Sequence, residues 1–175
     1  CLHPHRKQAR IKVLHNQLHI TVPAHWPADL KQKACRQLLA RSHARWQTDI
    51  DLLRTHTGPW INFEALQDLT LWVNTLNAQT LRAPLQGIKM GHAKISHMAQ
   101  LNTQTRIMTI SKYCVSQAPY QALRYLVIHE LAHCHVPNHS KAFWHWVDAF
   151  VPQRHYARRL MQASHALNVL QDDQI

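Results

Sequence analysis

Two histidines four residues apart, His129 and His133, enclose a glutamate within the stretch RYLVIHELAHCHVPNHSKAFW, residues 124–144. On a helix, residues at this spacing project from the same face, so both imidazoles can bind one metal ion. Glu130 lies about 100° further around the helix, where its carboxylate can reach a water molecule on the open side of the metal. The spacing therefore predicts a metal site that activates water.

A third histidine lies close enough in the sequence to bind the same metal ion. His139 comes six residues after His133, beyond the turn that Pro137 predicts. Zinc requires three protein ligands if its fourth position is to hold water, whose pKa then falls toward about 7. We therefore predict one Zn²⁺ per chain, bound by His129, His133 and His139, with Glu130 as the catalytic base that passes the water proton to the leaving group.

The bland alternative is an apolar helix whose histidines are hydrogen-bonded core residues. Histidine is common here, with sixteen in the chain, but Glu64 and Glu130 are the only glutamates, so a chance H-E-x-x-H motif is rare. Other polar residues near the motif are interpreted as structural. Cys134 and His135 are expected to pack or face solvent, and His145 also lies nearby in the sequence. Two strand residues are candidate donors to a substrate oxygen, although an ordinary strand role is simpler for both: His97 and Tyr113.

The N-terminal half is predicted from its periodicity. Residues 10–22 alternate apolar and polar residues, which indicates a hairpin ending at Pro23. Residues 27–55 predict one long helix, or two with a bend near Ser42. A second helix should run to about residue 77 with Asn62 as its N-cap. Its buried stripe is expected to be Phe63, Leu66, Leu69, Val73 and Leu76.

The C-terminal half has a different residue pattern, which predicts short strands followed by helices. Residues 84–115 predict three short strands, with turns near Gly91 and at residues 102–104. Pro119 should begin the motif helix, which is apolar almost all round to about residue 135 and therefore buried. Asn138 or Ser140 can cap the next helix. Residues 156–170 predict a last helix, followed by a frayed tail at 171–174.

These elements predict an α+β fold in which a small antiparallel sheet packs on the H-E-x-x-H helix, with additional N-terminal helices. A chain of 175 residues that is 46% hydrophobic can bury a real core. We expect residues 1–83 to form a hairpin and helical region packed on a core of residues 84–175, within one compact domain.

The composition narrows the environment and the partners. No apolar run is long enough to span a membrane, and four scattered cysteines suggest reduced thiols in a cytoplasmic protein: Cys1, Cys35, Cys114 and Cys134. The net charge is +11 and the pI is about 10.0. Such a surface attracts polyanions, so nucleic acid is a candidate partner, although a solvated basic surface is an equal alternative.

From Gly91 onward the chain resembles the SprT, WLM and YgjP-like group of zinc metallopeptidase domains. The matching residues are the motif His129-Glu130-Leu131-Ala132-His133, then Asn138-His139-Ser140, then Phe143-Trp144. The last two segments are most similar to the YgjP-like branch. The resemblance covers about half of the chain. It implies a zincin-like fold, the same three zinc ligands and the same catalytic glutamate, and some members of the group degrade proteins crosslinked to DNA.

The leading hypothesis is a zinc-dependent metallopeptidase that hydrolyses protein or peptide substrates, with the substrate strand beside an edge of the sheet. Nucleic-acid-associated proteins are a subsidiary expectation for the substrate. Two alternatives stay open. The same metal could serve a nucleotide pyrophosphatase or related hydrolase, with the basic surface binding phosphates. Alternatively, the chain is a nucleic-acid-binding module in which zinc is structural.

Overall fold

The computed structural model describes residues 2–3, 7–14, 17–94 and 97–172. It combines helices with short strands, as the α+β prediction requires. In chain order the elements are β1 (Leu2–His3), β2 (Arg10–Leu14), β3 (Gln17–Pro23), α1 (Ala28–Arg54), β4 (Trp60–Ile61), α2 (Leu66–Gln79), β5 (Gly87–Gly91), β6 (Ala99–Asn102), β7 (Ile107–Ser111), α3 (Lys112–Val115), β8 (Ala118–Pro119), α4 (Tyr120–Ala132), α5 (Lys141–Phe150) and α6 (Arg154–Asp172).

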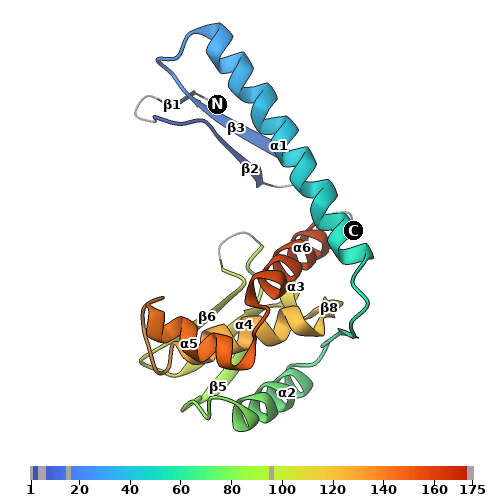
Figure 1. The fold of residues 1–175 in the computed structure, drawn as a ribbon, viewed down its shortest axis with the longest axis vertical. Coiled ribbons are helices and arrows are strands. Elements are labelled where there is room, and N and C mark those ends of the chain that lie inside the picture. Colours follow the sequence, from blue (N-terminus) through green and yellow to red (C-terminus); the bar gives the residue numbers. More distant parts are fainter. Residues whose placement is uncertain (1, 4–6, 15–16, 95–96, 173–175) are drawn as a thin grey trace.

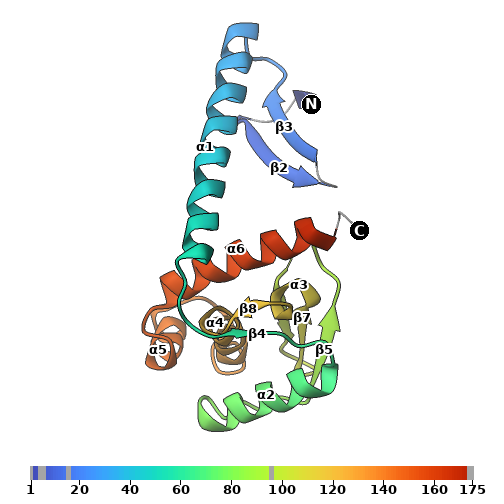
Figure 2. The ribbon, with the colours of Figure 1, turned by 90° about the vertical axis from the view of Figure 1, so that its right-hand side faces the viewer.

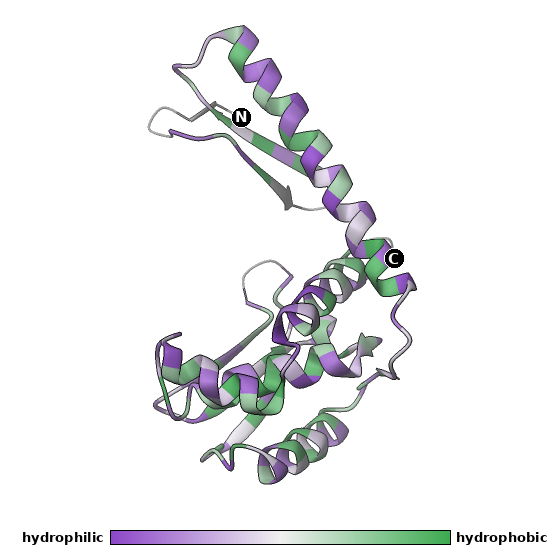
Figure 3. Cartoon of the chain, viewed as in Figure 1, coloured by the Kyte–Doolittle hydropathy of each residue, from purple (hydrophilic) through white to green (hydrophobic). Residues whose placement is uncertain are grey.

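The N-terminal hairpin and long helix are confirmed. Strands β2 and β3 pair antiparallel, and β1 joins the other side of β3 in parallel. Helix α1 is a single uninterrupted helix, so the alternative of two helices is wrong. Within α1 only Leu53, near its end, is buried, and hydrophilic residues recur along the helix (Figure 3). The hairpin and the first turns of α1 therefore extend away from the rest of the molecule (Figure 1).

Helix α2 begins later than predicted. Its N-cap is Ala65, so the assignment of Asn62 as the cap is wrong. The side chain of Asn62 is occupied elsewhere: its Oδ1 accepts a hydrogen bond from the Gln117 N–H at 3.1 Å, and its Nδ2 donates to Glu64. Gln117 has a φ of 42°, a left-handed conformation. Asn62 thus supports the turn that leads into β8 and the motif helix.

The central sheet contains the three predicted strands in the order β5-β7-β6. Strand β6 pairs antiparallel with β7, but β5 pairs with β7 in parallel, so the sheet is mixed where an antiparallel one was expected. Alternation along a strand predicts which face is buried and does not identify the partner strand. The parallel pair is close at Gly91, where a Cβ would lie 2.9 Å from Thr109 Cγ2.

Helix α4 lies in the interior, as its apolar composition predicted. Nine of its residues are buried, and it lies between α6 on one side and α2 on the other (Figure 2). It ends at Ala132, with His133 as the C-cap, three residues earlier than expected. Because its neighbours fix it on several sides, α4 is a rigid support for the side chains at its C-terminal end.

The C-terminal helices confirm one prediction and correct another. Ser140 caps α5, and its Oγ accepts a hydrogen bond from the Phe143 N–H. Helix α6 continues through Asp172, so the predicted frayed tail is wrong for residues 171–172, while 173–174 lie outside the described residues. Asp172 accepts hydrogen bonds from the Tyr113 hydroxyl at 2.7 Å and from Lys112 Nζ at 3.0 Å. Hydrogen bonds from Tyr113, Lys112 and Lys94, in that order, hold the pKa of Asp172 well below its usual range.

No helix in the described part of the chain is both long enough and apolar enough to cross a bilayer.

Candidate metal centre

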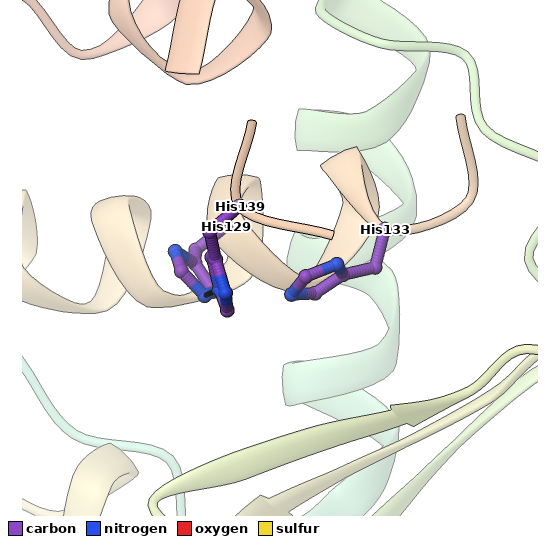
Figure 4. Close-up of side chains that lie close together, drawn as sticks. All are labelled: His129, His133 and His139. Carbon is purple, nitrogen blue, oxygen red and sulfur yellow. Dashed lines mark hydrogen bonds between the residues drawn. The ribbon is translucent and has the colours of Figure 1, made fainter. Parts of the chain in front are cut away.

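Three imidazoles converge at the C-terminal end of α4. His129 lies in the last turn of that helix, His133 caps it, and His139 lies in the segment that returns toward α5. One ring nitrogen from each residue lies within 4.8 Å of the others, and Figure 4 shows the ring of His133 pointing toward the other two. The Nε2 atoms of His129 and His139 are 3.0 Å apart. Nitrogens bound to one tetrahedral zinc lie about 3.3 Å apart, so the group is close to a metal-binding arrangement.

The surrounding residues orient these rings. His133 Nδ1 lies 3.2 Å from the carbonyl oxygen of Val136 and can donate to it, which leaves Nε2 free for a metal. Phe143, in the first turn of α5, is fully buried, and its ring centroid lies 4.5–4.9 Å from those of all three imidazoles. Trp144 stacks on His139 at 5.6 Å. The first turn of α5 therefore packs the histidines into one group.

The charge state of the histidines suits metal binding. Burial, with smaller contributions from His133 and His139, lowers the pKa of His129 to about 3. Burial also lowers the pKa of His133 from its usual value of 6.5. Both rings are therefore neutral at pH 7 and keep a lone pair for a metal. In the described part of the chain, His129 Nδ1 is buried without a hydrogen-bond partner. These converging neutral nitrogens fit a zinc-like cation.

Glu130 is a buried carboxyl beside the histidine group. Its side chain retains 8% exposure, and its Oε2 accepts a hydrogen bond from the backbone N–H of Leu101 in β6 at 3.0 Å. Burial raises the pKa of Glu130 to about 7, and the bond from Leu101 opposes that rise. In the metal-free protein this carboxyl therefore exchanges its proton near neutral pH.

A cavity of about 390 Å³ opens beside this group. His129, Glu130 and His139 line one part of it, and Ala99 of the edge strand β6 lines another. The two residues predicted to donate to a substrate oxygen, His97 and Tyr113, lie in different places. His97 lies in the loop before β6, outside any strand, and lines the cavity. Tyr113 lies in α3, is buried, and donates to Asp172, so the described structure does not place it on this wall.

Three polar residues of the cavity were missed by the sequence analysis. Tyr125 lies one turn before His129 on α4, and its spacing could have indicated the same helix face. Arg158 and Gln162 come from α6, where the sequence indicated only core packing and surface charge. Their four-residue spacing predicts a shared face, but no local signal indicates that this face meets the motif helix.

The other polar residues near the motif lie outside the histidine group. The backbone carbonyl of Cys134 accepts a hydrogen bond from Arg106 at 3.3 Å. His135 stacks on Trp146 with a centroid distance of 4.9 Å, and His145 is exposed. The positions of Cys134 and His135 agree with the expectation that they pack or face solvent.

The pH dependence of stability offers a test of the buried carboxyl. In the metal-free protein, Glu130 contributes stability that is present below pH 4.5 and is lost as the pH rises to about 7, because the folded state retains its proton. His129 acts in the opposite direction, since its contribution is present above pH 6.5 and is lost as the pH falls toward 3.

Glu130→Gln removes only the first contribution. The free energy of unfolding of the variant, minus that of the wild type, should therefore rise by about 2–3 kcal/mol between pH 4.5 and 7 and then level off. Urea unfolding of both metal-free proteins at several pH values measures this difference. A difference that does not change with pH would contradict the raised pKa of Glu130.

Comparison with known proteins adds the family. The sequence model described as "YgjP-like, metallopeptidase domain" matches residues 6–164. The curated proteins give no match. Among solved structures, the crystal structure of the metallopeptidase zymogen of Pyrococcus abyssi abylysin is similar, with a TM-score of 0.42 and 21% sequence identity, over 55% of this chain and 88% of that chain. Because the family model spans most of the 175 residues and agrees with the resemblance carried by the motif, this chain belongs to the YgjP-like metallopeptidase domain family.

Proposed function

We propose that this chain is a zinc-dependent metallopeptidase that binds one zinc ion through His129, His133 and His139 and uses Glu130 as its catalytic base. The observation that carries the proposal is the convergence of three imidazole nitrogens, two of whose residues line one cavity together with the buried carboxyl of Glu130. A donor set made only of imidazole nitrogens suits zinc, and three protein ligands leave a position for water.

When bound, zinc would supply a Lewis acid for the peptide carbonyl and would lower the pKa of the attacking water. The residues of the chain position the groups and transfer the proton. The Leu101 N–H binds Oε2 of Glu130, which leaves Oε1 to take the proton from the water. Glu130 then carries that proton to the nitrogen of the leaving amine. A carboxylate placed between the water and the leaving nitrogen can take the proton from the first and deliver it to the second.

Strand β6 supports a binding mode for the substrate. It is an edge strand, and the Leu101 N–H points away from β7 toward Glu130. Residues two apart on a strand face the same way, so the backbone of Ala99 also points outward, and Ala99 lines the cavity. We propose that an extended peptide pairs with Ala99, which brings its scissile bond beside the histidines.

Peptide hydrolysis tests the proposed function. The zinc-loaded protein should cleave members of a mixed peptide pool, a chelator should stop the reaction, and added zinc should restore it. Mass spectrometry of the new termini measures the products. If the zinc-loaded protein produces no new termini under conditions where it is folded, the proposed function is wrong.

A subsidiary proposal concerns nucleic-acid-associated proteins as substrates. Helix α1 carries exposed cations that include Lys33, Arg36 and Arg41, and the chain has a net charge of +11. Such a helix can contact phosphates weakly and in a salt-dependent way. A mobility-shift titration at several salt concentrations should then give weaker binding for a variant with these three residues changed to glutamine.

The organisation and location of the chain also remain proposals. We propose that residues 1–83 form an N-terminal region that packs on the catalytic core of residues 84–175 through its later part, which the burial of Leu69 and Val73 of α2 in the shared core supports. The hairpin and the first turns of α1 extend away from that core. The described cysteines, Cys35, Cys114 and Cys134, are free thiols. This supports the cytoplasmic location proposed from the sequence.

A second candidate activity is the hydrolysis of nucleotides on the same metal. The observation in its favour is a cation on the cavity wall, Arg158, which could contact a phosphate. Release of pyrophosphate from a nucleoside triphosphate by the wild type, absent in Glu130→Gln, would support this activity.

A further inference from the structure

Helix α6 presents two arginines, one turn apart, beside the cleft. The guanidinium of Arg154 lies 4.6 Å from the centroid of the Trp144 ring and is paired with Asp148. Its charge is therefore compensated. Arg158 is exposed and lines the cavity together with Gln162, and within the described ranges it has neither an ion pair nor a hydrogen bond. The two arginines thus have different environments despite their shared helix face.

Arg158 brings a positive charge to the wall of the cleft. It lines the same cavity as Tyr125 and His129 of the motif helix. Glu130 is the only acidic residue among those lining the cavity, and no ion pair joins it to Arg158 in the described structure. An uncompensated cation that faces a cavity favours an anionic ligand.

We propose that Arg158 binds a carboxylate of the substrate, so that the cleft selects peptides with a carboxylate close to the scissile bond. This inference rests on the proposed function, because it requires that the cleft receives peptides. A guanidinium can donate two parallel hydrogen bonds to one carboxylate, and the Gln162 amide, one turn further on the same face, supplies an additional donor. The carboxylate is either an Asp or Glu side chain or the free C-terminus of a peptide.

A nucleoside triphosphate fits the same surface less well. Sites for several phosphates combine multiple cations or a glycine-rich loop with a helix N-terminus. Among the described residues that line this cavity, Arg158 is the only lysine or arginine, and none is glycine. One guanidinium matches one carboxylate better than it matches a triphosphate.

Binding to an inactive protein tests Arg158 without depending on catalysis. The zinc-loaded Glu130→Gln protein is titrated by calorimetry, at physiological ionic strength, with matched peptides that differ only in their anion. One carries a glutamate and a C-terminal amide, one carries glutamine and a free C-terminus, and a neutral one carries glutamine and an amide. The titrations are repeated after adding Arg158→Gln or, as the matched control, Arg159→Gln, whose native arginine lies 3.6 Å from Asp49.

At least one carboxylate peptide should bind about tenfold more tightly than the neutral peptide. Arg158→Gln should remove this preference, and Arg159→Gln should keep it although it removes the same charge. The peptide that binds more tightly than the neutral one shows whether Arg158 recognises a side-chain carboxylate or the terminal carboxylate. Equal binding of all three peptides, or a preference that survives Arg158→Gln, would overturn the proposal, as would Arg158-dependent binding of a nucleoside triphosphate with no preference for carboxylate peptides.

These results are separable from the proposed function. A carboxylate preference in the inactive protein, combined with no peptide hydrolysis by the zinc-loaded wild type, would support Arg158 and contradict the peptidase. Peptide hydrolysis by the zinc-loaded wild type, with no carboxylate preference in the inactive protein, would support the peptidase and contradict the role of Arg158.

Discussion

Glu130→Gln should reduce peptide hydrolysis by roughly 10³-fold or more while the protein keeps its zinc, since a positioned general base contributes about 10²–10⁴-fold. The amide is nearly the same size as the carboxyl and can still accept the hydrogen bond from Leu101. It cannot take a proton from water. The loss should therefore appear in kcat, with the fold and the histidine group unchanged.

The chain offers a matched control for this substitution. Glu64 is the only other glutamate and is exposed, where its carboxylate accepts a hydrogen bond from Asn62. Glu64→Gln changes the charge in the same way and should leave the rate unaltered. Initial rates and zinc content are measured for all three proteins. Substantial hydrolysis by zinc-loaded Glu130→Gln would rule out the assigned base.

His139→Ala should weaken zinc binding by more than about 100-fold, the upper end of the effect of losing an outer partner of a ligand. His139 is the only member of the group outside α4 and its cap, and it is exposed. Its removal leaves two imidazoles from one helix, which are too few for a stable site. Because the side chain is exposed, the metal-free variant should unfold at nearly the wild-type temperature.

The control for His139 is another exposed histidine in the same region. His145→Ala, in α5, removes an imidazole that the structure does not place in the group and should leave zinc affinity unchanged. Competition with a chromogenic chelator measures the affinities of both variants. Zinc binding that is indifferent to His139 would mean that other residues complete the site.

The parts of the site that could be predicted from the sequence depend on local geometry. His129 and His133 converge because four residues make about one helical turn, and His139 returns because Pro137 prevents the helix from continuing. The single buried helix around them was also predictable, since Tyr120–Ala132 has almost no polar face.

The parts that could not be predicted depend on tertiary contacts. Nothing in residues 84–115 indicates that β5 pairs with β7 in parallel, because strand alternation carries no information about the partner. Asn62 has the residue type of an N-cap, but its side chain supports a turn 55 residues away. No local pattern indicates a role for Arg158, because only the packing of α6 against α4 brings it to the cavity.

The central claim is that three histidines form an open zinc site, and zinc K-edge X-ray absorption of the zinc-loaded wild type tests it most directly. The account predicts one zinc per chain, coordinated by three imidazole nitrogens and one further oxygen donor. A closed coordination by four protein ligands, a sulfur donor, or a spectrum that His139→Ala leaves unchanged would contradict it.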